Sequence, residues 1–365
     1  MGSPLEITAF NNTTSEDIVN YSQYNDTGFP FERPAEWGFW MKFVLTPVIV
    51  LAGLIGNTLS FIVMKSKTLR HKSYSHYLSA LAIFDTLTLL IRQVHTVDEF
   101  YSRNGANEIF RHFDDFGCKI FYFLEHIFYL MSHWLIVLMA VERLIAVCMP
   151  FKKVAIRKQL GATLTITAMF ISVCLSQVFR LIMVEHLSFS ETCGANDDYL
   201  DIYTSLHVYL YQWTLAFVLP VGLVLSCNLI VLYQIFKVKR DLKKKDRRNR
   251  QCRQARKNNK TTCMLLTVSF TFIGTLLPLL TLTLVLEISV KRLGRDAYTL
   301  YKMLMPYMEA FEALSLVNYA VNFYIYILSG RSFRYEMCRV FNRRGTTKRS
   351  FTGRSTRTRE EVIRL

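Results

Sequence analysis

A row of polar and charged residues lies along one face of an otherwise apolar stretch, 118–150. On a helix that turns about 100° per residue, Cys118, Glu125 and Ser132 fall within roughly 40° of one another, and Arg143 joins them. At about 1.5 Å per residue, the first and last of these are about 37 Å apart, slightly more than the ~30 Å of bilayer hydrocarbon. Because uncompensated charge in lipid is costly, this face is expected to contact other protein or water. Scattered polar residues tolerated inside a bundle are the alternative.

Membrane-length apolar runs recur along the whole chain of 365 residues, 51% of which are hydrophobic. Seven such runs lie at about 40–65, 75–96, 118–147, 160–184, 206–236, 261–287 and 302–328. Only helices and closed barrels satisfy their backbone hydrogen bonds in lipid, and no alternating strands of roughly ten residues are visible. The sequence therefore predicts an all-α membrane protein, a seven-transmembrane helix bundle over 39–330.

The formal net charge of +16 is unevenly distributed. Lys and Arg cluster at about 65–72, 152–158, 237–260 and 331–364, whereas the N-terminal segment and the alternate loops are acidic. This positive-inside pattern predicts a multi-pass plasma-membrane protein with its N-terminus outside and its C-terminus in the cytoplasm. Nucleic acid is therefore not an expected partner. The 237–260 segment is expected to be a solvated loop that meets anionic lipid.

The segment 1–38 is polar and lacks an apolar signal sequence, so the first run is expected to act as an uncleaved signal-anchor. Four N-x-S/T acceptors on the side predicted to be extracellular indicate a glycosylated tail. They are Asn11, Asn12, Asn20 and Asn25.

The other end of the chain is predicted to hold a short amphipathic helix on the membrane surface, over 331–342. Three apolar residues step by four along its lipid-facing side: Phe333, Met337 and Phe341. Cys338 in this helix is either a palmitoylation site or a plain thiol. The remaining residues, 343–365, are rich in Thr, Ser and Arg and are expected to be a disordered cytoplasmic tail.

The cysteines fit the same topology. Of the eight in the chain, only Cys118 and Cys193 lie at positions predicted to be extracellular, where oxidation is permitted. We therefore expect a Cys118–Cys193 disulfide, and the alternative is that both remain thiols. The other cysteines show no metal-ligand spacing.

Polar side chains are also predicted near the middle of the membrane. Asp85 lies about ten residues inside the second run, and an acid at that depth is expected to have a function. Asn318, Asn322 and Tyr326 step by four along one face of the seventh run. Asp85, Ser132, Asn318 and Asn322 could form an oxygen-rich cage for sodium, and a purely structural polar network is the alternative. No other cofactor is expected.

Several motifs together resemble those of the rhodopsin-like (class A) G protein-coupled receptors, over about 40–342. In chain order they are Gly56-Asn57, the L-x-x-x-A-x-x-D run ending at Asp85, Cys118 with Cys193, Glu142-Arg143, Pro220, Phe272, Pro278, and Asn322-x-x-x-Tyr326 followed by Phe333-Arg334. The resemblance implies a receptor that binds an extracellular ligand and promotes nucleotide exchange on a heterotrimeric G protein. It also implies arrestin and receptor kinases as partners, and no enzymatic chemistry.

The resemblance further implies a conformational switch that couples the ligand to the G protein. Its residues would be Glu142, Arg143, Phe272, Leu276, Asn322 and Tyr326. Several positions depart from the family pattern, and among them Leu144 replaces a tyrosine, Leu276 a tryptophan and Phe323 a proline. Activation is therefore expected to use other contacts, such as Phe272 against His133. These departures are similar to those of invertebrate neuropeptide receptors, notably receptors for FMRFamide-like peptides.

Acidic and aromatic residues gather toward the predicted extracellular ends of the runs. Those expected to contact the ligand are Glu99, Glu125, His126, Tyr129, Tyr209, Gln212, Glu309 and Glu312. An acidic vestibule with aromatic walls suits a cationic amidated neuropeptide, such as an Arg-Phe-amide. Another peptide or a small cationic ligand is the alternative, and for Glu99 ordinary extracellular charge is the better reading. Arg180 could meet a ligand carbonyl or pair with Glu185.

Two other classes of membrane protein would use a polar stripe differently. A transporter or channel would conduct ions or protons along it, but transporters show internal repeats, and the two halves of this chain share no similarity. An intramembrane enzyme would need a metal-binding His pair or paired acids at mid-span, and neither pattern is visible. The receptor is therefore the preferred interpretation.

Overall fold

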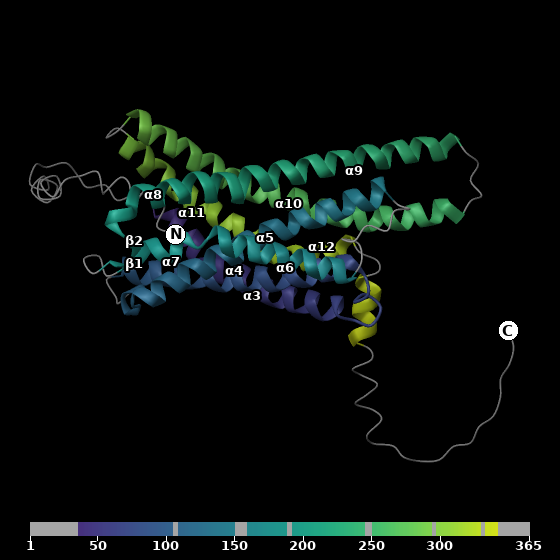
Figure 1. Ribbon diagram of the computed structural model, residues 1–365, viewed down its shortest axis with the longest axis horizontal. Helices are drawn as coiled ribbons and strands as arrows, with labels where there is room; N and C mark the ends of the chain where they lie inside the picture. Colours follow the sequence, from purple (N-terminus) through teal and green to yellow (C-terminus); the bar gives the residue numbers. More distant parts are fainter. Residues whose placement is uncertain are drawn as a thin grey trace, which may run out of the picture.

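The computed structural model describes residues 36–104, 109–149, 159–187, 192–244, 250–293, 297–329 and 333–341. The predicted glycosylation sites and the predicted tail over 343–365 lie outside these residues. The described chain forms a bundle of long helices that run along the longest dimension of the molecule (Figure 1).

The long helices are α3 (Trp37–Met64), α4 (Ser73–Arg103), α5 (Asp115–Cys148), α6 (Gln159–Ser176), α9 (Leu219–Lys244), α10 (Arg250–Leu293) and α11 (Ala297–Ala320). The shorter elements are η2 (Phe110–His112), α7 (Phe179–Met183), β1 (Val184–Leu187), β2 (Thr192–Ala195), η4 (Asp197–Tyr199), α8 (Leu200–Ser205), the π-helical η5 (Leu206–Val218) and α12 (Asn322–Ser329). Among the described residues, six helical stretches are long and apolar enough to cross a membrane. The pair α11 and α12, bent by 53°, provides a seventh if it is one span. The predicted seven-helix bundle is confirmed.

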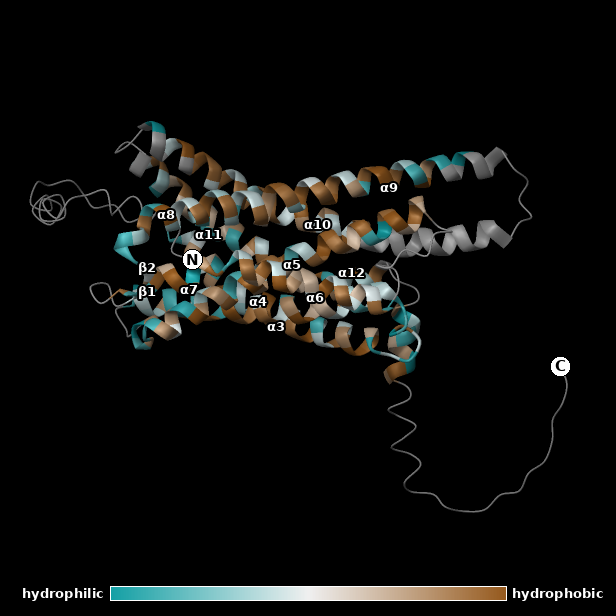
Figure 2. Cartoon of the chain, viewed as in Figure 1, coloured by the Kyte–Doolittle hydropathy of each residue, from teal (hydrophilic) through white to brown (hydrophobic). Residues whose placement is uncertain are grey.

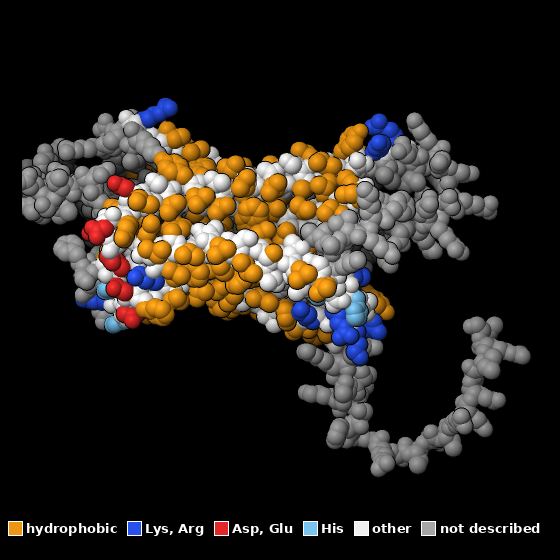
Figure 3. Space-filling model, in the orientation of Figure 1, with side chains coloured by type: hydrophobic (Ala, Val, Ile, Leu, Met, Phe, Trp, Pro, Cys, Tyr) orange, Lys and Arg blue, Asp and Glu red, His pale blue; other side chains and the backbone are white. Residues whose placement is uncertain are grey.

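The outside of the bundle is apolar. Brown hydrophobic ribbon dominates its middle in Figure 2, and Figure 3 shows a broad belt of hydrophobic side chains. Asp and Glu side chains are visible at one end of this belt, mixed with some Lys, Arg and His, whereas the visible charged side chains at the other end are Lys, Arg and His (Figure 3). In the stretch Gln159–Met183 only 17% of the apolar window is buried, so Leu160, Leu164 and Leu175 face outward. Such a surface suits lipid rather than water.

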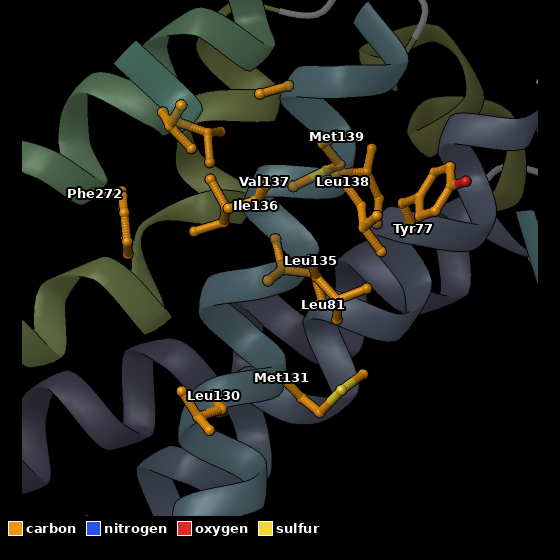
Figure 4. Close-up of a cluster of buried hydrophobic side chains, with 14 of the residues drawn as sticks. Tyr77, Leu81, Leu130, Met131, Leu135, Ile136, Val137, Leu138, Met139 and Phe272 are labelled. Atoms are coloured by element: carbon orange, nitrogen blue, oxygen red, sulfur yellow. The ribbon is translucent and has the colours of Figure 1, made fainter. Parts of the chain in front are cut away.

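Helix α5 lies at the centre of the bundle. Its apolar window is 61% buried, the largest share among the six single-helix stretches. Asp114 caps the start of α5, because its carboxylate accepts a hydrogen bond from the Gly117 backbone N–H at 2.7 Å. The core around the middle of α5 includes Leu81, Leu130, Met131, Leu135, Ile136 and Phe272 (Figure 4).

A β-hairpin covers the end of the bundle where α5 begins. Strands β1 and β2 pair antiparallel, with Val184 opposite Ala195 and Leu187 opposite Thr192. Cys193 on β2 is joined to Cys118 on α5 by a disulfide, with a Cα–Cα distance of 5.4 Å. The predicted disulfide is confirmed, and it fixes the hairpin over the first turns of α5.

Two helix boundaries differ from the sequence expectation. Helix α9 continues to Lys244 and α10 begins at Arg250, so helices occupy most of the segment 237–260 that was expected to be a loop. Lys, Arg and Gln are good helix formers, and a charged helix can extend into water beyond the membrane. The seventh run breaks between Ala320 and Asn322. Asn318 and Asn322 therefore belong to different helices, and the predicted continuous face is wrong.

Residues 333–341 are helical and leave the bundle at a steep angle (Figure 1). Phe333 is only 3% exposed, and its ring lies 5.9 Å from Phe323 and 5.7 Å from Tyr326 between centroids. Its predicted lipid-facing position is therefore wrong, because the apolar side of the first turn packs against α12. Phe341 is exposed, and so is Cys338, whose palmitoylation remains a prediction.

Helices α3 and α11 approach closely at Gly38. A Cβ atom added to Gly38 would lie 2.1 Å from the Pro306 carbonyl oxygen and 2.5 Å from the Pro306 Cα. Because these are backbone atoms, Gly38→Ala should destabilise the bundle by about 1–3 kcal/mol through overpacking. We expect a lower melting temperature for the purified protein in detergent.

Gly222 in α9 provides the matched control, because a Cβ atom added there would meet nothing within 4 Å. Gly222→Ala should stabilise the helix by up to about 1 kcal/mol through backbone propensity. Equal melting temperatures for the two variants would contradict the close approach of α3 and α11.

Candidate ligand-binding site

A cavity of about 590 Å³ lies at the hairpin end of the bundle. Residues of α3, α4, α5, β2, α8, η5, α10 and α11 line it. Its volume falls within the range of roughly 300–1,000 Å³ that is usual for sites that bind small molecules. The cavity can therefore hold a small ligand or the terminal residues of a peptide.

Charged side chains alternate in sign along one wall of this cavity, starting near its mouth. The Arg103 guanidinium lies 2.6 Å from a Glu309 carboxylate oxygen and 3.1 Å from Glu99. The other oxygen of Glu99 lies 2.7 Å from the Lys42 ammonium. These pairs connect α3, α4 and α11.

The alternation continues toward the interior. Lys42 also lies 2.8 Å from a Glu312 oxygen, and the other Glu312 oxygen contacts Arg92. Arg92 approaches Glu125 Oε1 at 3.9 Å, and His95 Nε2 approaches the same oxygen at 3.0 Å. Glu125 is on α5, so this part of the wall joins α5 to the three helices above.

We call this set the ionic ladder: Glu309, Arg103, Glu99, Lys42, Glu312, Arg92, Glu125 and His95. The outer pairs are partly exposed, but at the buried inner end, around Glu125, breaking an ion pair would cost about 3–5 kcal/mol. The sequence predicted an acidic vestibule, and the structure corrects that picture, because most of the acids are neutralised by cations of the same wall.

Sequence reasoning missed these cations, Lys42, Arg92 and Arg103. A signal was present for two of them, because Arg92, His95, Glu99 and Arg103 are spaced three or four residues apart and share one face of a helix. Asp98, on another face of α4, has a structural role, since it accepts hydrogen bonds from the backbone N–H groups of Ile109 and Phe110.

Glu125 differs from the other acids of the ladder. Its side chain is 6% exposed, and within the described chain its Oε2 atom has no hydrogen-bond partner. A small void of about 10 Å³, lined by Arg92, Tyr129 and Tyr211 among others, lies beside it. The ladder contains four glutamates against three Lys and Arg side chains. Its inner end therefore offers a carboxylate oxygen to a further cation.

The floor of the cavity is aromatic. The His133 ring lies 4.4 Å from Tyr129 and 4.9 Å from Phe272 between centroids, and its Nε2 is 3.0 Å from the Tyr319 hydroxyl. The predicted contact between Phe272 and His133 is therefore present. Leu276 is 1% exposed in the same core. The switching role of Phe272 and Leu276 remains a prediction.

The other residues predicted to contact the ligand divide into two groups. Glu99, Glu125, His126, Tyr129, Gln212, Glu309 and Glu312 line the cavity. Tyr209 is 50% exposed and is not part of the lining. Arg180 does not pair with Glu185, whose carboxylate accepts a hydrogen bond from Asn196 at 2.8 Å. Instead Arg180 is fully buried beside the cavity wall.

The predicted cation cage is partly assembled. Ser132 donates a hydrogen bond to Asp85, and the Asn322 amide donates to the other Asp85 oxygen at 2.7 Å. Asn318 is 1% exposed, but neither atom of its amide has a hydrogen-bond partner among the described residues. These contacts suit a structural network, and the orphaned Asn318 oxygen would suit a hard cation. Sodium binding remains a prediction.

The opposite end of α5 carries the other predicted pair. Arg143 Nε lies 2.7 Å from Glu142 Oε2, and Ser73 donates a hydrogen bond to Glu142 Oε1 at 3.0 Å. The guanidinium also lies 5.2 Å from the centroid of the Tyr74 ring. In this conformation Arg143 is therefore held against α4. Tyr326 is 1% exposed and packs against Phe333 on the same side of the bundle.

Comparison with known proteins agrees with this architecture. Residues 56–326 match the model of the family described as "7 transmembrane receptor (rhodopsin family)". The matched region includes both ends of α5 and most of the helices that line the cavity.

Similar proteins occur in Caenorhabditis elegans. The galanin-like G-protein coupled receptor npr-9 is 27% identical over 169 residues, and neuropeptide receptor 18 is 26% identical over 185 residues. Each alignment covers 46% of this chain and 37% of the relative, so the match spans little more than a third of those two proteins. A probable G-protein coupled receptor, B0563.6, is 23% identical over 307 residues, covering 81% of this chain and 68% of that protein. Together with the family match over 56–326, these similarities show that the chain belongs to the rhodopsin family of seven-transmembrane receptors.

Proposed function

We propose that this chain is a plasma-membrane receptor for an extracellular cationic amidated peptide of the Arg-Phe-amide type. The bound peptide would promote nucleotide exchange on a heterotrimeric G protein. The similar C. elegans proteins named as galanin-like and neuropeptide receptors support a peptide as the ligand.

The observation that carries the proposal is the inner end of the ionic ladder. Glu125 Oε2 lacks a hydrogen-bond partner within the described chain, although the side chain is almost completely buried. A guanidinium of the ligand could donate a charge-assisted hydrogen bond to this oxygen, because Oε1 already contacts His95. The aromatic floor around Tyr129 and His133 would then bury an adjacent phenyl ring.

The uneven charge supports the proposed orientation. The basic clusters at 65–72, 237–244 and 250–260 lie toward the end of the bundle opposite the cavity, where cytoplasmic residues are expected to be positive. The cavity would thus open to the outside. Arg143, at the other end of α5, would meet the G protein once its contact with Glu142 is released.

Screening amidated peptides on cells that express the chain, with a reporter of nucleotide exchange, tests the proposal first. The sharper test combines Glu125→Gln with an agonist from that screen whose arginine is replaced by citrulline. On the unchanged receptor, citrulline should lower potency by about tenfold or more, because a charge-assisted hydrogen bond becomes a neutral one. On Glu125→Gln, the two peptides should have similar potency.

Glu312→Gln is the matched control, because both oxygens of Glu312 are already used by Lys42 and Arg92. This variant should lower the thermal stability of the receptor, while the potency ratio of the two peptides stays unchanged. A citrulline penalty that persists on Glu125→Gln would remove Glu125 from the site.

The contact between Glu142 and Arg143 generates a second prediction. Glu142→Gln weakens the ion pair at 2.7 Å but keeps the side-chain volume. This should shift the equilibrium toward the conformation with Arg143 released by about 1 kcal/mol, so the rate of nucleotide exchange without ligand should rise several-fold. Glu336→Gln, which removes a buried acid in the helix 333–341, is the control. Unchanged basal exchange in Glu142→Gln would contradict the restraining role of this pair.

A further inference from the structure

A buried cation lies behind Tyr203 and His207 in the wall of the cavity. Arg180 on α7 is 0% exposed, and its three guanidinium nitrogens each meet an uncharged acceptor. Nε donates to Gln177 Oε1 at 3.0 Å, one terminal nitrogen donates to the Tyr203 hydroxyl at 2.7 Å, and the other meets His207 Nδ1 at 2.8 Å. The ring of Tyr211 covers the guanidinium at 4.7 Å. Arg180 is therefore held in place, fully buried and not itself part of the cavity lining.

These contacts fix the hydrogen-bonding roles of two residues that line the cavity. A guanidinium can only donate, so His207 Nδ1 must accept from Arg180 and Nε2 must carry the ring proton. For the same reason the Tyr203 hydroxyl accepts from Arg180, and its own proton remains available to another acceptor. Tyr203 and His207 both line the cavity, and their rings stack 5.8 Å apart between centroids. Together they present hydrogen-bond donors.

A third residue presents the opposite role. His126 Nδ1 lies 2.6 Å from the Tyr122 carbonyl oxygen, and because a carbonyl can only accept, Nδ1 is the donor. In the neutral ring Nε2 is then an acceptor, and it has no hydrogen-bond partner within the described chain although His126 is 1% exposed. His126 lines the cavity, and its ring centroid is 5.5 Å from that of His207.

Two donors and one acceptor in such proximity match a single chemical group. A primary carboxamide accepts hydrogen bonds at its oxygen and donates them from its nitrogen. We propose that Tyr203, His207 and His126 bind the C-terminal carboxamide of the peptide, and we call these three residues the carboxamide subsite. Arg180 is a positioning residue that sets the proton positions of Tyr203 and His207. This inference rests on the proposed function as a peptide receptor, and it identifies the residues that bind the C-terminal group of the peptide.

The subsite should discriminate against a free C-terminal acid. A carboxylate has no proton for His126 Nε2, so it would have to protonate that ring and place a second positive charge beside Arg180. His126 follows Glu125 directly in α5, and both line the cavity. One ligand that carries a cation next to a terminal aromatic amide could therefore contact both residues.

Three probes test this on the purified full-length receptor: Arg-Phe-amide, the free acid Arg-Phe, and arginyl-phenethylamide, which lacks the carboxamide. Their affinities follow from ligand-dependent thermal stabilisation, which needs no G protein. We expect the amide to bind about tenfold or more tightly than either analogue, because each leaves a buried donor or acceptor unpaired. Tyr203→Phe and His207→Phe should abolish the preference over arginyl-phenethylamide, whereas Tyr199→Phe, at a residue 42% exposed outside the lining, should preserve it.

Several results would overturn the subsite. They are equal binding of the amide and of arginyl-phenethylamide, tighter binding of the free acid, a preference over arginyl-phenethylamide that survives Tyr203→Phe, and no saturable stabilisation by the amide at millimolar concentration. Tyr203→Phe removes a single oxygen atom, so it keeps the test decisive if His207→Phe does not fold.

The failure of the subsite and that of the proposed function have different signatures. An amidated agonist whose potency in nucleotide exchange is unaffected by Tyr203→Phe refutes the subsite and leaves the receptor proposal intact. The expected order of the three probes, together with no exchange for any amidated peptide, refutes the proposed coupling and leaves the subsite intact.

Discussion

Charge inside a membrane must be compensated by protein, and this constraint explains the arrangement of the bundle. Isolated Lys, Arg or Glu side chains would be expensive in hydrocarbon. Here they alternate in sign from Arg103 at the mouth of the cavity to Glu125 in its interior. Apart from the Arg103–Glu99 pair within α4, each contact in the series joins two helices, so the wall that holds the ligand site also holds α3, α4, α5 and α11 together.

Helix α5 connects the ligand site to the opposite end of the molecule. Glu125 belongs to the cavity, Ser132 contacts Asp85 in the middle of the bundle, and Glu142 restrains Arg143 at the far end. Between them most of the helix is packed against other parts of the bundle, because 61% of its apolar window is buried. A change of charge at one end can therefore alter packing along a nearly rigid element, which is how a two-state switch responds to a ligand.

The elements that sequence predicted well are those governed by local composition or by topology. The apolar runs correspond to the membrane-length helices. Cys118 and Cys193, the two cysteines predicted to be extracellular, form the disulfide. Glu142 and Arg143, which are neighbours in the sequence, contact each other as expected. The mid-membrane acid Asp85 accepts hydrogen bonds from two of its three expected partners, Ser132 and Asn322.

The errors arose where the outcome depends on how helices are rotated against one another. Tyr209 faces outward because it lies in a π-helical stretch, η5, whose side-chain period differs from that of an α-helix. Arg180 lies on α7 and contacts Tyr203 and His207, whereas Glu185 lies on strand β1 and contacts Asn196. The cations of the ladder were overlooked for the same reason, because pairs such as Lys42 with Glu312 are far apart in the sequence.

The most direct test of the central claim is a thermodynamic cycle at Lys42, measured as the free energy of unfolding of the purified receptor without ligand. Lys42→Met leaves Glu99 and Glu312 without their shared cation at 2.7 and 2.8 Å, and it should cost about 3 kcal/mol. Lys42→Met combined with Glu312→Gln should recover at least half of that loss, since one uncompensated charge is removed. If the single substitution is neutral, or if the two substitutions add without coupling, charge pairing does not hold this bundle together.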